Sequence, residues 1–420
     1  MDNYIIAEVN AKNQFVVRGQ LTLDRDDLSS IVGSGRTSDV HAIYNYQIQS
    51  NFVMLKQPEV DNSTHFVAKI WRDVPITHEQ SEKLRYMVRN KFTYQSTSYV
   101  IWPEYVLLAT TPSPRNTSDD VQSSETVHLH DQHEDELEKL MKDKEIIYDN
   151  GNLDNELEMF MKLNKFTVGE EIIYDDSAMI VGYIMPRVLG ASPLYKLMDP
   201  SERALLPLEY KDSRFLYHVA MNMARAFYVV HKQHHIMGDT NPTNILVTSD
   251  GEVILIDCDS FQIQRNSTEF YAADRRSSSS NTTLEVSTAS DLINMAVLIF
   301  QLLMQGAHPF AGRNRNSISK SKEMRAQRIF IFDHPAYKPI DGTPSFNCLP
   351  ESLRSLFVDA FTNQPHNPPS AVDWVKTLKS VSSQLVQCSV DHNHYHVKEH
   401  LCAECEWQKG RLATPVDESI

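Results

Sequence analysis

The stretch MGDTNPTNILV at 237–247, followed by VILID at 253–257, carries the pattern that decides the fold. Asn244 follows Asp239 by five residues, and a hydrophobic strand, a turn and a second strand then lead to Asp257. The pattern predicts a hairpin that brings two carboxylates and one amide to one edge. Polar groups between Val, Ile and Leu runs are difficult to explain as core. The alternative is that Asp239 and Asn244 merely form a turn.

This set of side chains suits phosphoryl transfer. One carboxylate, Asp239, would orient the attacking hydroxyl and accept its proton. The amide of Asn244 and the carboxylate of Asp257 would hold Mg²⁺ against the phosphates. We therefore predict Asp239 as the catalytic base and Asn244 and Asp257 as magnesium ligands.

A glycine-containing turn lies upstream in GSGRTSDV at 33–40, between two predicted strands. In that context the backbone N–H groups around Gly33, Ser34 and Gly35 can close over nucleotide phosphates. Taken alone, the turn also fits an ordinary hairpin.

Lys69 ends another predicted strand, in FVAKI at 66–70. Its ammonium can pair with phosphate oxygens and with a carboxylate on the next helix. Glu82 is our choice for that carboxylate and Glu79 is the second. Lys69 alone would be interpreted as a solvated lysine at a strand end, and its coupling to the glycine turn argues for the site.

The predicted elements are β-rich first and helical second. Alternation from Tyr4 to Ile70 predicts several antiparallel strands, and apolar residues four apart from Phe215 to Phe227 predict a buried helix. Further predicted elements are helices at 76–89 and 292–303 and strands at 99–108, 178–188, 245–247 and 253–256. The polar, acidic segment at about 110–171 is interpreted as an insertion.

Composition limits the classes of function. The chain has 420 residues, 41% of them hydrophobic, and a formal charge of −15, which argues against nucleic acid and anionic membranes as general partners. The longest apolar stretch, 292–304, is too short to cross a bilayer, and the N-terminus lacks a basic leader or long apolar run. Five cysteines do not make a disulfide scaffold. We expect a cytoplasmic protein.

A cluster of potential metal ligands lies near the C-terminus. Cys388, a histidine, Cys402 and Cys405 lie within eighteen residues, which suits a closed tetrahedral zinc site of structural type. His394 gives the spacing C-x5-H-x7-C-x2-C, and the competing histidines are His392, His396 and His400. Free cysteines in a histidine-rich tail are the alternative.

From Ile31 to about Leu378, interrupted by the insertion, the chain resembles the eukaryotic-type protein kinase superfamily. The resemblance implies an α+β, bilobal kinase-like fold, ATP with Mg²⁺, and the roles already given to Lys69, Glu82, Asp239, Asn244 and Asp257. It also implies a nucleotide-binding set consisting of Gly33, Ser34, Gly35, Val40, Ala68, Lys69, Met185 and Val188. Downstream matches are 268–274 as the end of an activation segment, GAHPF at 306–310, and Asp291 as the buried aspartate that braces the catalytic loop.

More narrowly, GDTNPTNILV, LIDCDSFQI, MPRV at 185–188 and the C-terminal cysteines resemble a bacterial branch. Its members carry a zinc-binding or helix-hairpin-helix tail. They tend to be encoded beside a metal-dependent Ser/Thr phosphatase and a von Willebrand A-type protein, as in tellurite-resistance-associated triads. The branch implies these two proteins as partners, and it implies His394, followed by Tyr395, as the fourth zinc ligand.

Several positions depart from the superfamily pattern. Ser38 replaces the third glycine, and Met237-Gly238 replaces the His-Arg that precedes the catalytic aspartate. The segment Asp257-Cys258-Asp259 lacks the usual phenylalanine. Asp274 replaces the glutamate that ends the activation segment, and Pro368 replaces its arginine partner. These departures predict slow turnover and no control by phosphorylation of the activation loop.

The sequence therefore predicts a kinase N-lobe at 1–188, a C-lobe at 189–382 and a zinc-binding tail at 383–420. The predicted activity is transfer of the γ-phosphoryl group of ATP to Ser or Thr of a protein substrate or of the kinase itself, in bacterial signalling or stress response. One alternative is a pseudokinase scaffold that binds nucleotide without turnover. Another is a small-molecule kinase of the aminoglycoside or choline type, against which the activation-segment matches argue.

Overall fold

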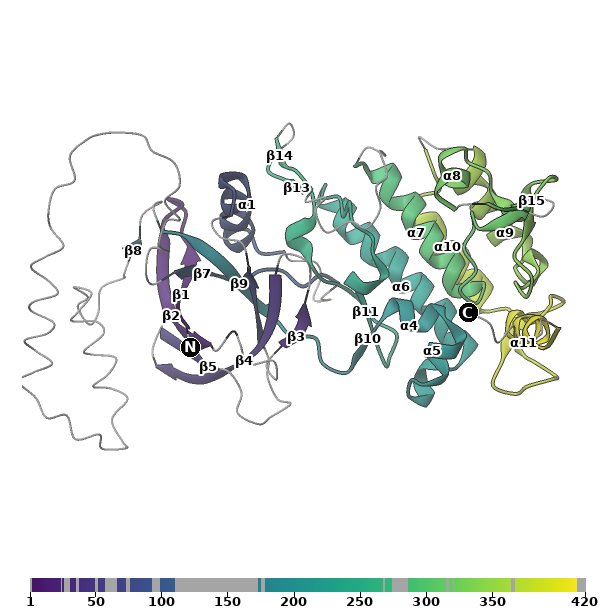
Figure 1. Cartoon of the computed structure of the whole chain (residues 1–420), viewed down its shortest axis with the longest axis horizontal. Coiled ribbons are helices and arrows are strands. Elements are labelled where there is room, and N and C mark those ends of the chain that lie inside the picture. The colour runs from purple at the N-terminus through teal and green to yellow at the C-terminus, as the bar shows by residue number, and fades with distance from the viewer. Residues whose placement is uncertain are drawn as a thin grey trace, which may run out of the picture.

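A computed structural model describes residues 2–23, 25, 31–34, 38–49, 52–56, 66–72, 76–92, 99–109, 173–174, 178–266, 269–273, 286–314, 317–319, 321–363 and 367–413. Within these residues, a β-rich N-terminal part is followed by a largely helical C-terminal part (Figure 1). The order of elements predicted from the sequence is therefore confirmed.

The N-terminal part is built on one sheet of nine strands. These are β1 (Asp2–Val9), β2 (Phe15–Leu23), β3 (Ile31–Ser34), β4 (Ser38–Gln49), β5 (Phe52–Lys56), β6 (Phe66–Trp71), β7 (Tyr105–Ala109), β8 (Ile173–Tyr174) and β9 (Ile180–Pro186). The hydrogen-bonded order β1-β7-β9-β6-β4-β5-β2 returns to β1, so these strands close into a ring, with β3 on β4 and β8 on β2. Pairing is antiparallel except between β2 and β5.

Alternation along β6 places its side chains on two sides of the sheet. Val67 and Trp71 pack with Leu84 and Val88 of helix α1 (His78–Arg89). The intervening residues Ala68 and Ile70 pack in a separate cluster on the other side. Lys69, between them, shares the side of Val67 and Trp71. Because Lys69 lies on this face of the sheet, its side chain points toward the candidate site.

The C-terminal part is organised around two long buried helices. α6 (Ser213–Lys232) and α7 (Thr288–Leu303) each contribute more buried residues to the large hydrophobic core than any other element of this part. The other helices are α4 (Leu194–Met198), α5 (Pro200–Ala204), α8 (Ser321–Ala326), α9 (Glu351–Val358), which a π turn at Asp359–Asn363 extends, and α10 (Ala371–Ser382). The short strands are β10 (Ala191–Pro193), β11 (Ile245–Thr248), β12 (Val253–Leu255), β13 (Ile263–Gln264), β14 (Phe270–Tyr271), β15 (Gly312–Asn314), β16 (Ser317–Ser319) and β17 (Lys338–Pro339).

Two predicted elements differ from their bounds in the structure by four residues or more. Helix α7 begins at Thr288 rather than at 292, because Ser287 and Ser290 form a reciprocal capping box that starts the helix earlier. The predicted strand at 99–108 is regular only from Tyr105, and the preceding residues instead approach β12, with Val100 bridged to Leu255.

The C-terminal tail consists of β18 (Leu385–Gln387), β19 (Tyr395–Val397) and α11 (Ala403–Ala413), at the end of the molecule far from the β-rich part (Figure 1). It packs against the helical part. The backbone N–H of Tyr395 donates to Ser213 Oγ at 3.0 Å, and the Arg214 guanidinium lies 4.0 Å from the centre of the Tyr395 ring. The tail is therefore anchored at the start of α6.

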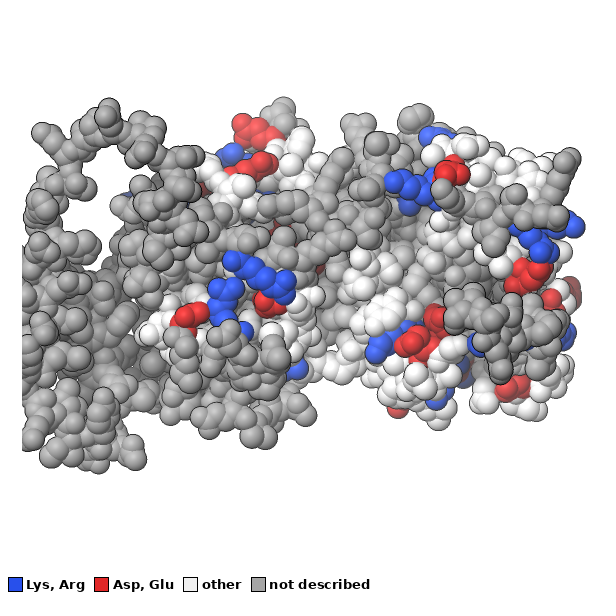
Figure 2. All heavy atoms as spheres, viewed as in Figure 1, with Lys and Arg blue, Asp and Glu red and all other residues white. Residues whose placement is uncertain are grey.

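The described surface is mixed in charge. Figure 2 shows Lys and Arg interspersed with Asp and Glu over the described part of one face. Among the described residues, none of the helices combines the length and apolarity needed to span a bilayer.

A buried histidine predicts how stability depends on pH. His235 stacks on Trp102, and burial lowers the pKa of His235 from 6.5 to about 4. The native ring therefore stays neutral while the unfolded chain takes up a proton, so the free energy of unfolding falls as pH drops from 6.5 to 4. His235 contributes at most about 3 kcal/mol to this loss.

Chemical denaturation of wild type and His235→Asn at several pH values measures that contribution. Asparagine can accept the Gln264 N–H that His235 Nδ1 accepts at 3.1 Å, but it does not titrate. We expect the free energy of unfolding to depend less steeply on pH in the variant. Part of the dependence that remains comes from His308, because burial also lowers the pKa of His308 to about 4. Identical slopes for the two proteins would show that His235 is not a neutral buried group.

Candidate active site

The hairpin of β11 and β12 positions two of the predicted site residues. Asn241 caps a short 3-10 turn, Pro242–Asn244, by accepting the N–H of Thr243 at 3.0 Å. Ile256 N–H then donates to the carbonyl of Asn244 at 2.9 Å. Asp257 follows directly, so Asn244 and Asp257 are held at the same end of the hairpin.

Asp239 lies on the loop before this hairpin and is 8% exposed. The loop turns through Gly238, whose φ of 70° is a left-handed conformation that favours glycine. A Cβ at Gly238 would also lie 3.1 Å from Ala273 Cβ. Glycine at the position where the superfamily has arginine is therefore a requirement of this backbone.

Asp291 braces the same loop from helix α7. Its carboxylate accepts the N–H groups of Met237 at 2.7 Å and Gly238 at 3.1 Å and contacts His231 Nε2 at 3.0 Å. Its side chain is fully buried. The predicted bracing role of Asp291 is confirmed.

Replacing Asp291 with alanine is expected to lower the free energy of unfolding by about 3 to 5 kcal/mol, because buried donors lose their charged acceptor. Urea denaturation measures this cost. Asp341→Ala is the matched control, because its side chain is 57% exposed and pairs with Arg313 at the surface. We expect the control to cost less than about 1 kcal/mol. Equal costs for the two variants would contradict the bracing role.

Asp257 has a strained backbone and a perturbed carboxyl group. Its φ of 66° lies in the left-handed region, which Asp adopts more readily than most residues. Burial raises the pKa of Asp257, against the opposing charge of Lys69, and the charges of Asp259 and Asp239 raise it further. A strained acid in a cluster of acids is typical of a functional site.

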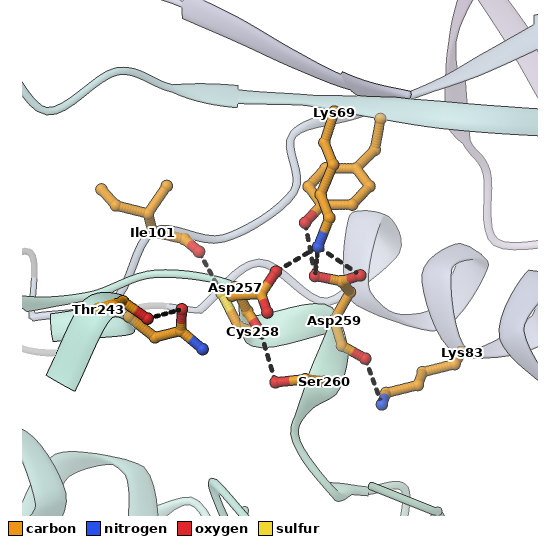
Figure 3. Close-up of polar contacts among 10 residues, drawn as sticks. Lys69, Lys83, Ile101, Thr243, Asp257, Cys258, Asp259 and Ser260 are labelled. Atoms are coloured by element: carbon orange, nitrogen blue, oxygen red, sulfur yellow. Dashed lines mark hydrogen bonds and ion pairs between the residues drawn. The ribbon is translucent and has the colours of Figure 1, made fainter. Parts of the chain in front are cut away.

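Lys69 extends from β6 toward this cluster (Figure 3). Its ammonium contacts Asp257 and both carboxylate oxygens of Asp259, the latter at 2.8 and 3.0 Å. Its side chain is 9% exposed. Burial lowers the pKa of Lys69, but the two carboxylates outweigh burial, and the net pKa is raised. Lys69 is therefore a charged, buried lysine in contact with a predicted metal ligand.

The expected ion pair between Lys69 and Glu82 does not form in this structure. Glu82 pairs instead with Arg85, one turn along α1, at 3.5 Å. The reason is helical phase, since the buried face of α1 presents Lys83 toward the site. Glu79, the second choice, accepts the backbone N–H of Ala272 at 3.3 Å.

Strands β3 and β4 flank the predicted glycine turn and pair with each other, Gly33 with Val40 and Ser34 with Asp39. Ser34 Oγ donates to Asp39 at 2.7 Å, and Arg72 Nε reaches the same carboxylate at 2.8 Å. Gly35, the third predicted residue of this turn, lies outside the described residues. The two flanking strands have the predicted arrangement.

The apolar residues predicted to bind the nucleotide divide between the two sides of the sheet. Val40, Met185 and Val188 pack with the cluster on the Lys69 side. Ala68 is fully buried in the cluster on the opposite side, so its prediction as a nucleotide contact is wrong. A strand turns successive side chains to opposite faces, and Val67 is the neighbour that shares the face of Lys69.

The C-terminal cysteines come together as predicted. The sulfur atoms of Cys388, Cys402 and Cys405 lie within 4.8 Å of one another and are buried. Cys405 Sγ lies 3.6 Å from Nδ1 of His394, and Nε2 of the same ring lies 3.5 Å from the Asp391 carboxylate. Of the competing histidines, His396 contacts the carbonyl of Val397 through Nδ1, and His400 contacts the carbonyl of Asn347 through Nδ1.

Other predictions fall on parts of the chain that the structure does not describe. These are the insertion at 110–171, the activation-segment residue Thr268 and the segment-ending Asp274.

Sequence reasoning missed Asp259, Tyr183 and Lys83. The Tyr183 hydroxyl donates to Asp259 at 2.6 Å, and Lys83 donates to the backbone carbonyl of Asp259 at 2.6 Å. An acid two residues after Asp257 was visible in the sequence, but no local pattern links it to a lysine 190 positions away.

No protein-family model matches the chain. Two curated relatives do, the protein kinase YegI of Escherichia coli K12 and its counterpart in E. coli O157:H7. Each is 29% identical over 245 residues, which is 54% of this chain and 37% or 38% of the relative. The match thus spans well under half the length of these relatives. Together with the β-rich part, the helical part and the clustered Lys69, Asp239, Asn244 and Asp257, this homology supports a protein-kinase-like family for the chain.

Proposed function

We propose that this protein is an ATP-dependent protein kinase that phosphorylates Ser or Thr hydroxyls of protein substrates. The observation that carries the proposal is that Lys69, from the sheet, meets Asp257 at the end of the hairpin that also holds Asn244. Asp239, on the loop before that hairpin, is close enough for its charge to raise the pKa of Asp257. The four predicted phosphotransfer residues are therefore neighbours.

Each residue has a distinct role in the proposed site. Asp239 orients the acceptor hydroxyl and takes its proton, and Asn244 and Asp257 hold Mg²⁺. A bound Mg²⁺ supplies positive charge that offsets the negative charge on the phosphates. Lys69 adds an ammonium at the phosphate position. The oxygen donors of Asn244 and Asp257 are the type that Mg²⁺ prefers.

The β3–β4 hairpin and the apolar residues on the Lys69 side of the sheet complete the proposed ATP site. Gly33 and Ser34 lead into the turn that covers the phosphates. Val40, Met185 and Val188 line the adenine position, with Val67 in place of Ala68. This assignment treats the β-rich and helical parts as the lobes of a bilobal kinase-like fold, with boundaries near residues 188 and 382.

The test is transfer of radiolabel from γ-labelled ATP with Mg²⁺ to the protein and to a generic protein acceptor. Phosphoamino-acid analysis of the product identifies the acceptor residue type. We expect phosphoserine or phosphothreonine in wild type and no label with Lys69→Ala. Absence of label in wild type, with nucleotide binding intact, would overturn the proposal and favour a pseudokinase scaffold. Label that reaches only a small-molecule acceptor would favour the aminoglycoside or choline kinase type.

The tail cysteines support a structural zinc site, which we include in the proposal. With Zn–S bonds of about 2.3 Å, tetrahedral geometry places thiolates about 3.8 Å apart. The sulfurs of Cys388 and Cys405 are 3.7 Å apart. His394 is the fourth donor, oriented by Asp391 in the manner of carboxylates that support metal-bound histidines.

Partners and location belong to the same proposal. The resemblance to the bacterial branch supports a metal-dependent Ser/Thr phosphatase and a von Willebrand A-type protein as partners, in cytoplasmic phosphorylation signalling or stress response. Co-purification of the tagged chain with these two proteins tests the assignment. Their absence from the recovered complex would contradict it.

A further inference from the structure

Asp259 is a buried acid for which the proposed function has no role. Both of its carboxylate oxygens accept from Lys69, and one also accepts from the Tyr183 hydroxyl at 2.6 Å. Its side chain is 15% exposed. Tyr183 lies directly opposite Lys69 in the β6–β9 pairing, so one sheet register supplies both donors. The sheet and the loop after Asp257 therefore meet at this carboxylate.

We propose that Asp259 is the positioning residue that holds Lys69 against the nucleotide, in the place of an acid on helix α1. The inference rests on the proposed function, because it assigns how that site keeps its lysine in place. An ammonium on a four-carbon stem has many rotamers, and a fixed counter-charge selects the one that faces the site.

Asp257 alone is not suited to this task. It also pairs with Lys69, but it is the carboxylate proposed to hold Mg²⁺. A carboxylate bound to a divalent cation offers less negative charge to a neighbouring ammonium. Asp259 supplies a separate negative charge whose two oxygens are already directed at Lys69. Lys69 thus keeps a negatively charged partner when Asp257 binds the metal.

Helix α1 supports the loop rather than the lysine. Lys83 donates to the backbone carbonyls of Asp259 at 2.6 Å and of Ala272 at 3.1 Å (Figure 3 shows the first contact). Glu82 is engaged with Arg85 on the flank of the helix. A cation on the inward face of α1 would repel Lys69 but stabilises the carbonyls of the loop. The acid that Lys69 needs is therefore placed on the loop itself.

Reductive methylation of the full chain without nucleotide tests the inference independently of turnover. In wild type, we expect Lys69 to resist dimethylation while Lys409, 72% exposed, reacts fully. Asp259→Asn should raise the rate at Lys69 about 10-fold, since a charge-assisted bond is lost, and Asp259→Glu should restore protection. Glu82→Gln, the matched control on α1, should leave the rate unchanged. Peptide mass spectrometry gives the rate at each lysine.

A second variant guards against misfolding. Tyr183→Phe keeps every charge in the site and removes only the hydroxyl that orients Asp259. We therefore expect the methylation rate at Lys69 to rise about 3-fold. Unchanged rates in both Asp259→Asn and Tyr183→Phe would overturn the inference. The inference would also be overturned if Lys69 lost its protection from methylation in Glu82→Gln and kept it in Asp259→Asn, because that result would place the counter-ion of Lys69 on α1.

The transfer assay separates this inference from the proposed function. Asp259→Asn should lower kcat/KM for ATP about 100-fold, with recovery in Asp259→Glu, because small misplacements of a phosphate-binding group are costly. If wild type transfers no label but the methylation pattern holds, the kinase proposal fails and the positioning role stands. If wild type transfers label and the methylation pattern fails, the positioning role alone is wrong.

Discussion

Replacing Asp239 with asparagine is expected to lower the rate of phosphoryl transfer by about 1,000-fold. Asparagine keeps the size of the side chain and can still accept the N–H of Asn241, which the Asp239 carboxylate accepts at 3.2 Å. It cannot take a proton from an acceptor hydroxyl. The loop, braced by Asp291, should therefore stay folded while the proposed base is lost. The measurement is the initial rate of label transfer at saturating ATP.

Asp250→Asn is the matched control for this change. Asp250 lies in the turn between β11 and β12, and its side chain is exposed, so the same substitution there should leave the rate within about 2-fold. Nucleotide affinity, measured with a fluorescent ATP analogue, should change little in Asp239→Asn. If Asp239→Asn retained most of the wild-type rate of transfer, Asp239 would not be the base.

Removing zinc is expected to detach the C-terminal tail from the helical part. Closed sites of this type contribute folding free energy directly, and the tail's three thiols form a small core of their own. We expect about one zinc ion per chain in the wild-type protein, and its loss in Cys402→Ser. The contacts of Tyr395 with Ser213 and Arg214 should then open, and limited proteolysis should cut the chain within 383–413.

Cys348→Ser controls for the general effect of altering a buried thiol. Cys348 is 2% exposed but lies outside the metal cluster. We expect this variant to keep its zinc and its resistance to proteolysis. A wild-type protein that binds no zinc, or a Cys402→Ser tail as resistant as wild type, would contradict the metal site and favour unligated cysteines.

The elements predicted with most success were those defined by local pattern. The β11–β12 hairpin and helix α6 follow from alternation and four-residue spacing over short windows, which physical chemistry ties to one backbone geometry. The cluster of Cys388, Cys402 and Cys405 follows in the same way, because its members are close in the chain. Bracing by Asp291 came from the family resemblance, and the structure confirms it.

Errors arose where a side chain's direction had to be known. Alternation along β6 could have shown that Ala68 and Lys69 face opposite sides, so that error was avoidable from the sequence. The wrong partner for Lys69 could not have been corrected from strand alternation in the same way. Glu82 was chosen from the pattern of the kinase superfamily that the sequence resembles, while the phase of α1 turns Lys83 inward and Glu82 toward Arg85.

The sequence by itself determined the principal strands and helices, and it placed Asp239, Asn244 and Asp257 around one hairpin, because those residues are near neighbours in the chain. Only the tertiary structure decided that the N-terminal strands close into a ring and that Lys69 meets Asp259. The physical reason is that each strand or helix fixes its own faces locally. Which faces meet depends on how all the elements pack together to bury their apolar sides and pair their buried charges.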